Sequence, residues 1–188
     1  MQNYRFQFVR KSSPPPPLFA VHGHHVELFS LGEEASQGLK ELSQDGPTAI
    51  LEAELADKGV KTYVHDGLIL PGQTGVMWVT TYGENFGSAA AMLARTNDAF
   101  IGARKIPLAM YWGKKQTVLL RVYDSGAEEI NESYDYIPAP PCNNPGEEGG
   151  TPEGFVHFHP GIFGIADLDV LRDSWGAYAA KMVIERVR

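Results

Sequence analysis

Three acidic residues lie next to apolar segments, where the chain is expected to turn. Asp98 directly precedes one apolar run, and Asp124 ends another. A sharp turn at Gly126 would bring Asp124 and Glu128 to the same point, with Asp98 on a neighbouring loop. Calcium prefers several hard oxygen ligands, mostly carboxylates and carbonyls. The spacing therefore allows a three-carboxylate calcium site, and equally an ordinary turn in which Asp124 caps backbone amides.

Two histidine-rich segments form a second candidate site. His157 and His159 are two residues apart in VHFHP, as are His22 and His24 in HGHH. Residues two apart point to the same face of a strand. If the four imidazoles met, they would suit zinc or copper. The alternative is that they are hydrogen-bonded histidines in two separate strands.

No catalytic motif accompanies these residues. The sequence contains no G-x-S-x-G and no H-E-x-x-H pattern. Its one cysteine, Cys142, lies among prolines and asparagines, with no helix N-terminus to lower the pKa of its thiol. We therefore expect no enzyme. Hydrolysis by a metal-bound water at the histidines is the third-ranked hypothesis.

Composition limits the class of protein and its partners. A chain of 188 residues fits one domain, residues 1–188, and its 20 Gly and 13 Pro favour many short strands joined by turns. The net charge of −7 argues against nucleic acid as a partner. No apolar run approaches the roughly 20 residues of a membrane-spanning helix. The N-terminus has no apolar core of a signal peptide, so an export signal is absent from the sequence as given.

Hydrophobic periodicity predicts mostly strands. Residues 3–9 alternate as in a first or edge strand, and residues 18–22 and 26–30 resemble short buried strands. Residues 86–95, FGSAAAMLAR, fit either a helix by composition or a buried strand. Residues 138–154 form a long loop of the kind that is usually functional or mobile. Further strands are expected in VKTYVH, TGVMWVTTYG, KQTVLLRVYD and AKMVIERVR.

Residues 31–58 differ from the rest because their apolar residues recur at helical spacing. Leu39 and Leu42 define a first short helix, and Ile50, Leu51 and Leu55 lie on one face of a second. We expect these two helices to pack on a sheet.

The segments TNDAFIG and YDSGAEE resemble the paired signatures of spondin domains. In that family an Asp of the first segment and two acids of the second bind calcium, and these positions fall on Asp98, Asp124 and Glu128. HHVELFSLGEEASQGLKELSQDG and GFVHFHPGIFGIADLD are similar to segments of the bacterial branch. Glu128 stands where animal members carry Asp, and their cysteines are missing here.

The resemblance implies an all-β fold, an antiparallel β-sandwich related to C2 domains with the metal at one end. It favours the strand interpretation of residues 86–95. It also implies an exported module, secreted, periplasmic or on the cell surface, that binds calcium and a protein, glycan or other surface ligand. The alternative function is copper or zinc handling through His22, His24, His157 and His159.

Overall fold

The computed structural model describes residues 1–10, 16–108, 111–139, 142, 144–146 and 149–187. The part of the loop 138–154 at residues 140, 141, 143, 147 and 148 lies outside the described residues. The strands are β1 (Gln2–Arg10), β2 (Leu18–His22), β3 (Lys61–Val64), β4 (Thr74–Thr81), β5 (Phe86–Met92), β6 (Ala99–Pro107), β7 (Lys115–Asp124), β8 (His157–Phe158) and β9 (Ala180–Arg186). The helices are α1 (Gln37–Gln44), α2 (Ala49–Asp57), α3 (Val170–Asp173) and the 3-10 turn η1 (Tyr134–Tyr136).

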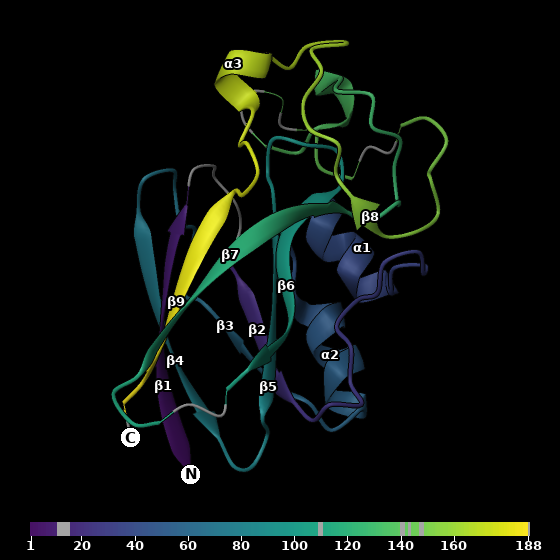
Figure 1. Ribbon diagram of the computed structural model, residues 1–188. Helices are drawn as coiled ribbons and strands as arrows, with labels where there is room; N and C mark the ends of the chain where they lie inside the picture. The colour runs from purple at the N-terminus through teal and green to yellow at the C-terminus, as the bar shows by residue number, and fades with distance from the viewer. Residues whose placement is uncertain (11–15, 109–110, 140–141, 143, 147–148, 188) are drawn as a thin grey trace.

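The strands form two antiparallel sheets that share β7 (Figure 1). Lys115–Leu120 of β7 pair with β9, whereas Arg121–Asp124 pair with β6. The complete order is β3-β2-β5-β6-β7-β9-β1-β4, with the short β8 added to the end of β7. The outermost strands also meet, because Tyr63 Oη of β3 donates to Thr80 O of β4 at 2.6 Å. The predicted all-β antiparallel architecture is confirmed, and its shape is nearly that of a barrel.

The core lies between the sheets and follows the period of two that β-strands impose. In β4, Met77 and Val79 are buried while Trp78 points outward and is exposed. Phe6 of β1 packs on Phe19 of β2 with ring centroids 4.2 Å apart. Each such fully buried aromatic or aliphatic side chain contributes about 1.5–3 kcal/mol to folding.

Helix α1 packs on β5 and β6 and helix α2 packs on β3, so both helices lie against the sheet, as the helical spacing predicted (Figure 1). Ser36 caps α1, because its hydroxyl accepts from the backbone N–H of Leu39. The helices approach closely at Gly38, where a Cβ atom would lie 2.3 Å from the backbone nitrogen of Leu51. Leu51 faces the core, but Ile50, which the sequence placed on the same face, is exposed.

Three sequence-based expectations are settled by the pairing pattern. Residues 86–92 form β5, so the strand interpretation is confirmed. Residues 26–30 form no strand. Leu28 and Phe29 are nevertheless buried in one hydrophobic cluster with Leu39 of α1, and Phe29 packs on Phe100 with ring centroids 4.9 Å apart. The first strand is no edge strand, because β1 lies between β4 and β9.

The described chain begins and ends at the same end of the sheets. Tyr4 of β1 pairs with Arg186 of β9, and both chain ends lie at the lower end in Figure 1, away from β8. Within the described ranges, none of the helices is both long and apolar enough to cross a bilayer.

Candidate metal centre

Strand register brings two of the predicted acids together. Ala99 of β6 pairs with Asp124 of β7, so Asp98 stands beside the end of β7. The chain then turns at Gly126, which has φ +72°, and a Cβ atom there would lie 2.5 Å from the backbone of Phe155. The turn therefore needs glycine for its conformation and for the close approach of the segment that leads into β8.

Asp98 is fully buried and is held through one oxygen. Its Oδ2 accepts from Ser125 Oγ at 2.8 Å, from the backbone N–H of Ala127 at 2.7 Å and from that of Glu128 at 3.2 Å. Its Oδ1 has no hydrogen-bond partner among the described residues. One oxygen thus orders the loop, and the hydrogen bonds of the described residues leave the other unused.

The two carboxylate oxygens of Asp124 also differ in their hydrogen bonding. It is fully buried, and its Oδ1 accepts from the backbone N–H of Gly126 at 2.8 Å. Its Oδ2 has no hydrogen-bond partner within the described part of the chain.

Residues of helix α1 form hydrogen bonds to the third acid and to the loop that carries it. Glu128 is buried, and its Oε1 accepts from Gln44 Nε2 at 3.0 Å. The neighbouring residue of α1, Ser43, forms a hydrogen bond between its hydroxyl and that of Ser125 at 2.8 Å. The inserted helices therefore position the loop that carries the acids.

The cluster has little positive charge near it. Among the described residues, neither Asp98 nor Asp124 forms an ion pair with Lys or Arg. Burial raises the pKa of Asp98. Burial, and secondarily the Asp98 carboxylate, raise the pKa of Asp124 to about 9. Buried carboxylates without a counter-charge are unfavourable, so this end of the molecule favours binding of a proton or a metal cation.

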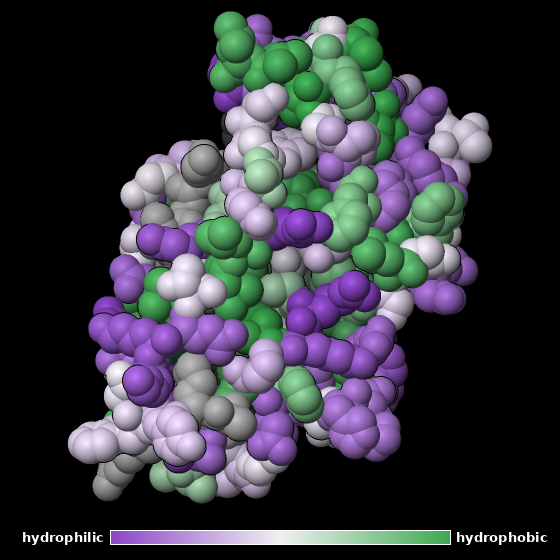
Figure 2. Space-filling view, viewed as in Figure 1, coloured by the Kyte–Doolittle hydropathy of each residue, from purple (hydrophilic) through white to green (hydrophobic). Residues whose placement is uncertain are grey.

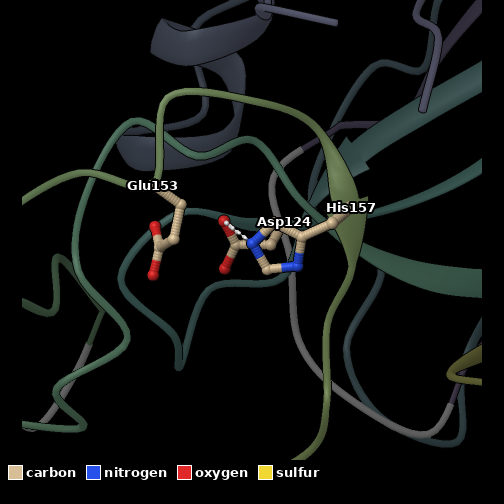
Figure 3. A group of neighbouring side chains, drawn as sticks. All are labelled: Asp124, Glu153 and His157. Atoms are coloured by element: carbon tan, nitrogen blue, oxygen red, sulfur yellow. Dashed lines mark ion pairs between the residues drawn. The ribbon is translucent and has the colours of Figure 1, made fainter. Parts of the chain in front are cut away.

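Strand β8 adds histidine to the cluster. His157 Nε2 lies 3.5 Å from Asp124 Oδ1, and His159 Nε2 lies 4.0 Å from Asp124 Oδ2 (Figure 3 shows His157). His159 Nδ1 accepts from the backbone N–H of Gly161 at 3.0 Å. Burial, and secondarily His157, lower the pKa of the His159 imidazole to about 4, so this ring is neutral at pH 7.

Glu153 completes the group, and the sequence analysis missed it. One ligand atom each from Asp124, Glu153 and His157 lie within 4.8 Å of one another (Figure 3). Glu153 is placed by a contact between loops, since the backbone N–H of Gly154 donates to Gly126 O at 2.9 Å. No spacing rule in the sequence marks such a contact.

The four predicted histidines do not converge. His22 pairs with Phe86, which pairs with Pro107 at the far end of β6, whereas Asp124 pairs with Ala99 at the near end. His22 has ordinary partners, Gly23 O at 2.8 Å from Nδ1 and Ser88 Oγ at 2.8 Å from Nε2.

His24, two residues beyond His22, packs against His25 with ring centroids 3.5 Å apart and the rings tilted. Sequence reasoning could not place these rings relative to His157 and His159, because the separation depends on strand register.

Comparison with known families identifies the family of the chain. A family model for the spondin N-terminal domain, Spondin_N, matches residues 16–144, more than half of the chain. The chain belongs to the spondin family. The spondin match includes Asp98, Asp124 and Glu128 and ends before Glu153 and His157. Spondin domains are typical of extracellular proteins. A search of curated proteins found no match for the chain.

Proposed function

We propose that this spondin domain is an exported, non-enzymatic calcium-binding module that binds a partner at the cell surface or outside the cell. The observation that carries the proposal is the division of roles within two buried carboxylates. Asp98 and Asp124 each use one oxygen to order the loop around Ser125 and Gly126, and each has a second, buried oxygen with no hydrogen-bond partner among the described residues.

The donor set suits calcium. Carboxylate oxygens of Asp98, Asp124 and Glu128 are hard ligands, and backbone carbonyls or water complete such sites. When bound, calcium supplies the positive charge that the buried carboxylates lack. Extracellular modules with dissociation constants of roughly 0.1–1 mM stay loaded outside the cell.

The surface beside the acids supports a partner-binding role. A cavity of about 300 Å³ lies next to His159, and its lining includes Arg121, Phe158, Trp175 and Tyr178. Arg121 lies over the Phe158 ring at 5.0 Å. Aromatic faces and a guanidinium suit a glycan, a protein side chain or another surface ligand. A metal that stiffens the loop Ser125–Glu128 would also steady this surface, since β8 pairs with the end of β7.

Calcium titration of the chelator-treated chain tests the proposal. We expect one calcium per chain by isothermal titration calorimetry and a stabilisation of about 2.7 kcal/mol at 100 times the dissociation constant. Asp98→Asn should weaken calcium binding at least tenfold. Asp135→Asn is the matched control, because this exposed residue of η1 takes no part in the cluster.

The results separate calcium binding from a turn-only role of the acids. A calcium-dependent rise in melting temperature that Asp98→Asn removes and Asp135→Asn keeps would support the proposal. Equal melting temperatures in calcium and in chelator would overturn it, because Asp98 and Asp124 would then act only as turn residues.

A further inference from the structure

We propose that Asp124, Glu153 and His157 form a second cation position that takes a transition metal of the zinc class. This position lies beside the proposed calcium site and shares Asp124 with it, so it extends the proposed function and rests on it in that respect. A mixed set of one imidazole and two carboxylates suits zinc better than calcium, because imidazole is a ligand of transition metals.

The first support is the state of the His157 ring. Its Nδ1 lies 3.1 Å from Phe158 O, a carbonyl that can only accept, so Nδ1 carries the hydrogen. In the neutral ring Nε2 then carries a lone pair. This arrangement, with Nδ1–H on a backbone carbonyl, orients histidine to bind metal through Nε2.

The second support is the position of His157 Nε2 beside a carboxylate oxygen. It lies 3.5 Å from Asp124 Oδ1, is itself buried and has no hydrogen-bond partner in the described part of the chain. A lone pair of the neutral ring therefore faces a carboxylate oxygen. The two repel each other unless a proton or a metal ion lies between them or beside them.

The third support comes from the two carboxylates. Asp124 is fully buried, and its Oδ2 has no hydrogen-bond partner among the described residues. Glu153 is held at one oxygen by the backbone N–H of Ile130 at 3.4 Å, and its Oε2 is buried with no partner in that same part of the chain. Figure 3 shows Glu153 and His157 on either side of Asp124, so three side chains from different segments point to one place.

His159 has a different part from His157. Because its Nδ1 accepts from Gly161 N–H, the neutral ring carries its hydrogen on Nε2, the atom that faces Asp124 Oδ2 at 4.0 Å. A nitrogen that bears a hydrogen cannot ligate a metal. His159 is therefore no ligand of the proposed position, and it packs on Trp175 with ring centroids 5.1 Å apart.

The test is a zinc titration of the tag-free, chelator-treated chain in saturating calcium, with His157→Gln and Glu153→Gln as the probing variants. We expect one zinc per chain in the unmodified protein and at least a tenfold loss of zinc affinity in each variant. Calcium affinity should stay within about threefold in both variants, because neither residue belongs to the set Asp98, Asp124 and Glu128. Cobalt in place of zinc gives a visible ligand-field spectrum that His157→Gln should change.

The double variant His24→Gln/His25→Gln is the matched control for zinc binding at exposed histidines. Zinc binding that is lost in this control but kept in His157→Gln would overturn the proposal. So would the absence of stoichiometric zinc binding. One-for-one displacement of calcium by zinc would mean a single shared position and would also overturn it.

The two proposals fail in different ways. Zinc binding that depends on His157 in a chain that binds no calcium would remove the calcium module and keep the second position. Calcium binding that depends on Asp98 in a chain that binds no zinc would do the opposite.

Discussion

Two groups of buried carboxylates at the loop end of this spondin domain differ in how their oxygens are satisfied. Glu132 is buried, and each of its oxygens accepts one backbone N–H, from Phe163 at 2.6 Å and from Ile165 at 2.9 Å. Asp98 and Asp124 are as deeply buried, yet each has one oxygen with no hydrogen-bond partner in the described ranges. Burial of an acid therefore does not by itself indicate a metal site. The number of oxygens that accept hydrogen bonds distinguishes Glu132, where both do, from Asp98 and Asp124, where only one does among the described residues.

The largest effect is expected from removing the satisfied carboxylate. Glu132→Ala should lower the free energy of unfolding by about 3–6 kcal/mol, since hydrogen bonds to charged groups contribute about 1.5–3 kcal/mol each. The loss should be the same in calcium and in chelator, as measured by denaturant unfolding. Glu132→Gln keeps one acceptor oxygen and should lose less. A loss confined to the calcium-loaded protein would place Glu132 in the metal site and break the comparison.

The next effect concerns the pH dependence of the metal-free protein. The pKa of Asp124 is raised to about 9 in the folded state, so that state holds a proton that the unfolded chain releases near its ordinary pKa of 3.8. Stability in chelator should therefore fall as pH rises from 5 to 8, by at most about 4 kcal/mol for one proton. Calcium would replace the proton, so the gap in melting temperature between calcium and chelator should widen over the same range.

Asp124→Asn provides the control for this pH effect. The amide does not titrate, so the variant in chelator should lose most of the slope and be more stable than the unmodified protein at pH 8. A slope that persists unchanged in Asp124→Asn would assign the pH dependence to other groups.

A smaller loss of stability is expected from a substitution at the end of the sheets opposite the acids. Ser88→Ala removes the hydroxyl that pairs with His22 Nε2 and should cost about 1–2 kcal/mol. The calcium-induced rise in melting temperature should be unchanged, because His22 lies at the far end of β6 from Asp98. A weaker calcium response in this variant would mean that the two ends are coupled.

The smallest loss of stability is expected when a hydrogen bond between α1 and the acidic loop is removed. Ser43→Ala removes the hydrogen bond to Ser125 Oγ and should lower stability by about 1 kcal/mol. Calcium affinity should fall a few-fold, since Ser125 also donates to Asp98. Calorimetry on this variant beside Ser88→Ala, which removes a hydroxyl of the same size, separates a loss of loop order from a general loss of stability.

Sequence patterns predicted most strands and helices because these patterns follow from the geometry of each element alone. The alternation in residues 3–9, which lie in β1, follows from the period of a strand, and the spacing of Leu39 and Leu42 follows from that of a helix. The run at residues 26–30 was misread because an apolar segment buried under helices has the composition of a strand without its pairing. Ile50 was misassigned because short helices define a face poorly.

The candidate site was only partly predictable for a related reason. Asp98, Asp124 and Glu128 belong to short segments whose pattern resembles a family signature. Glu153 joins them only because a distant loop packs on Gly126. Whether His22 lies near His157 depends on the register across β5, β6 and β7, which no single segment encodes.

The pairing of Tyr4 with Arg186 has a consequence for how such a unit is displayed. Peptide joined before β1 and after β9 would leave the fold on one side, about 30 Å along β7 from Asp124 at a rise of roughly 3.3 Å per residue. Flanking segments on both sides of the domain would therefore attach at the same end of the sheets. The acidic loops and the neighbouring cavity lie at the other end, where a binding partner can reach them without displacing these flanking segments.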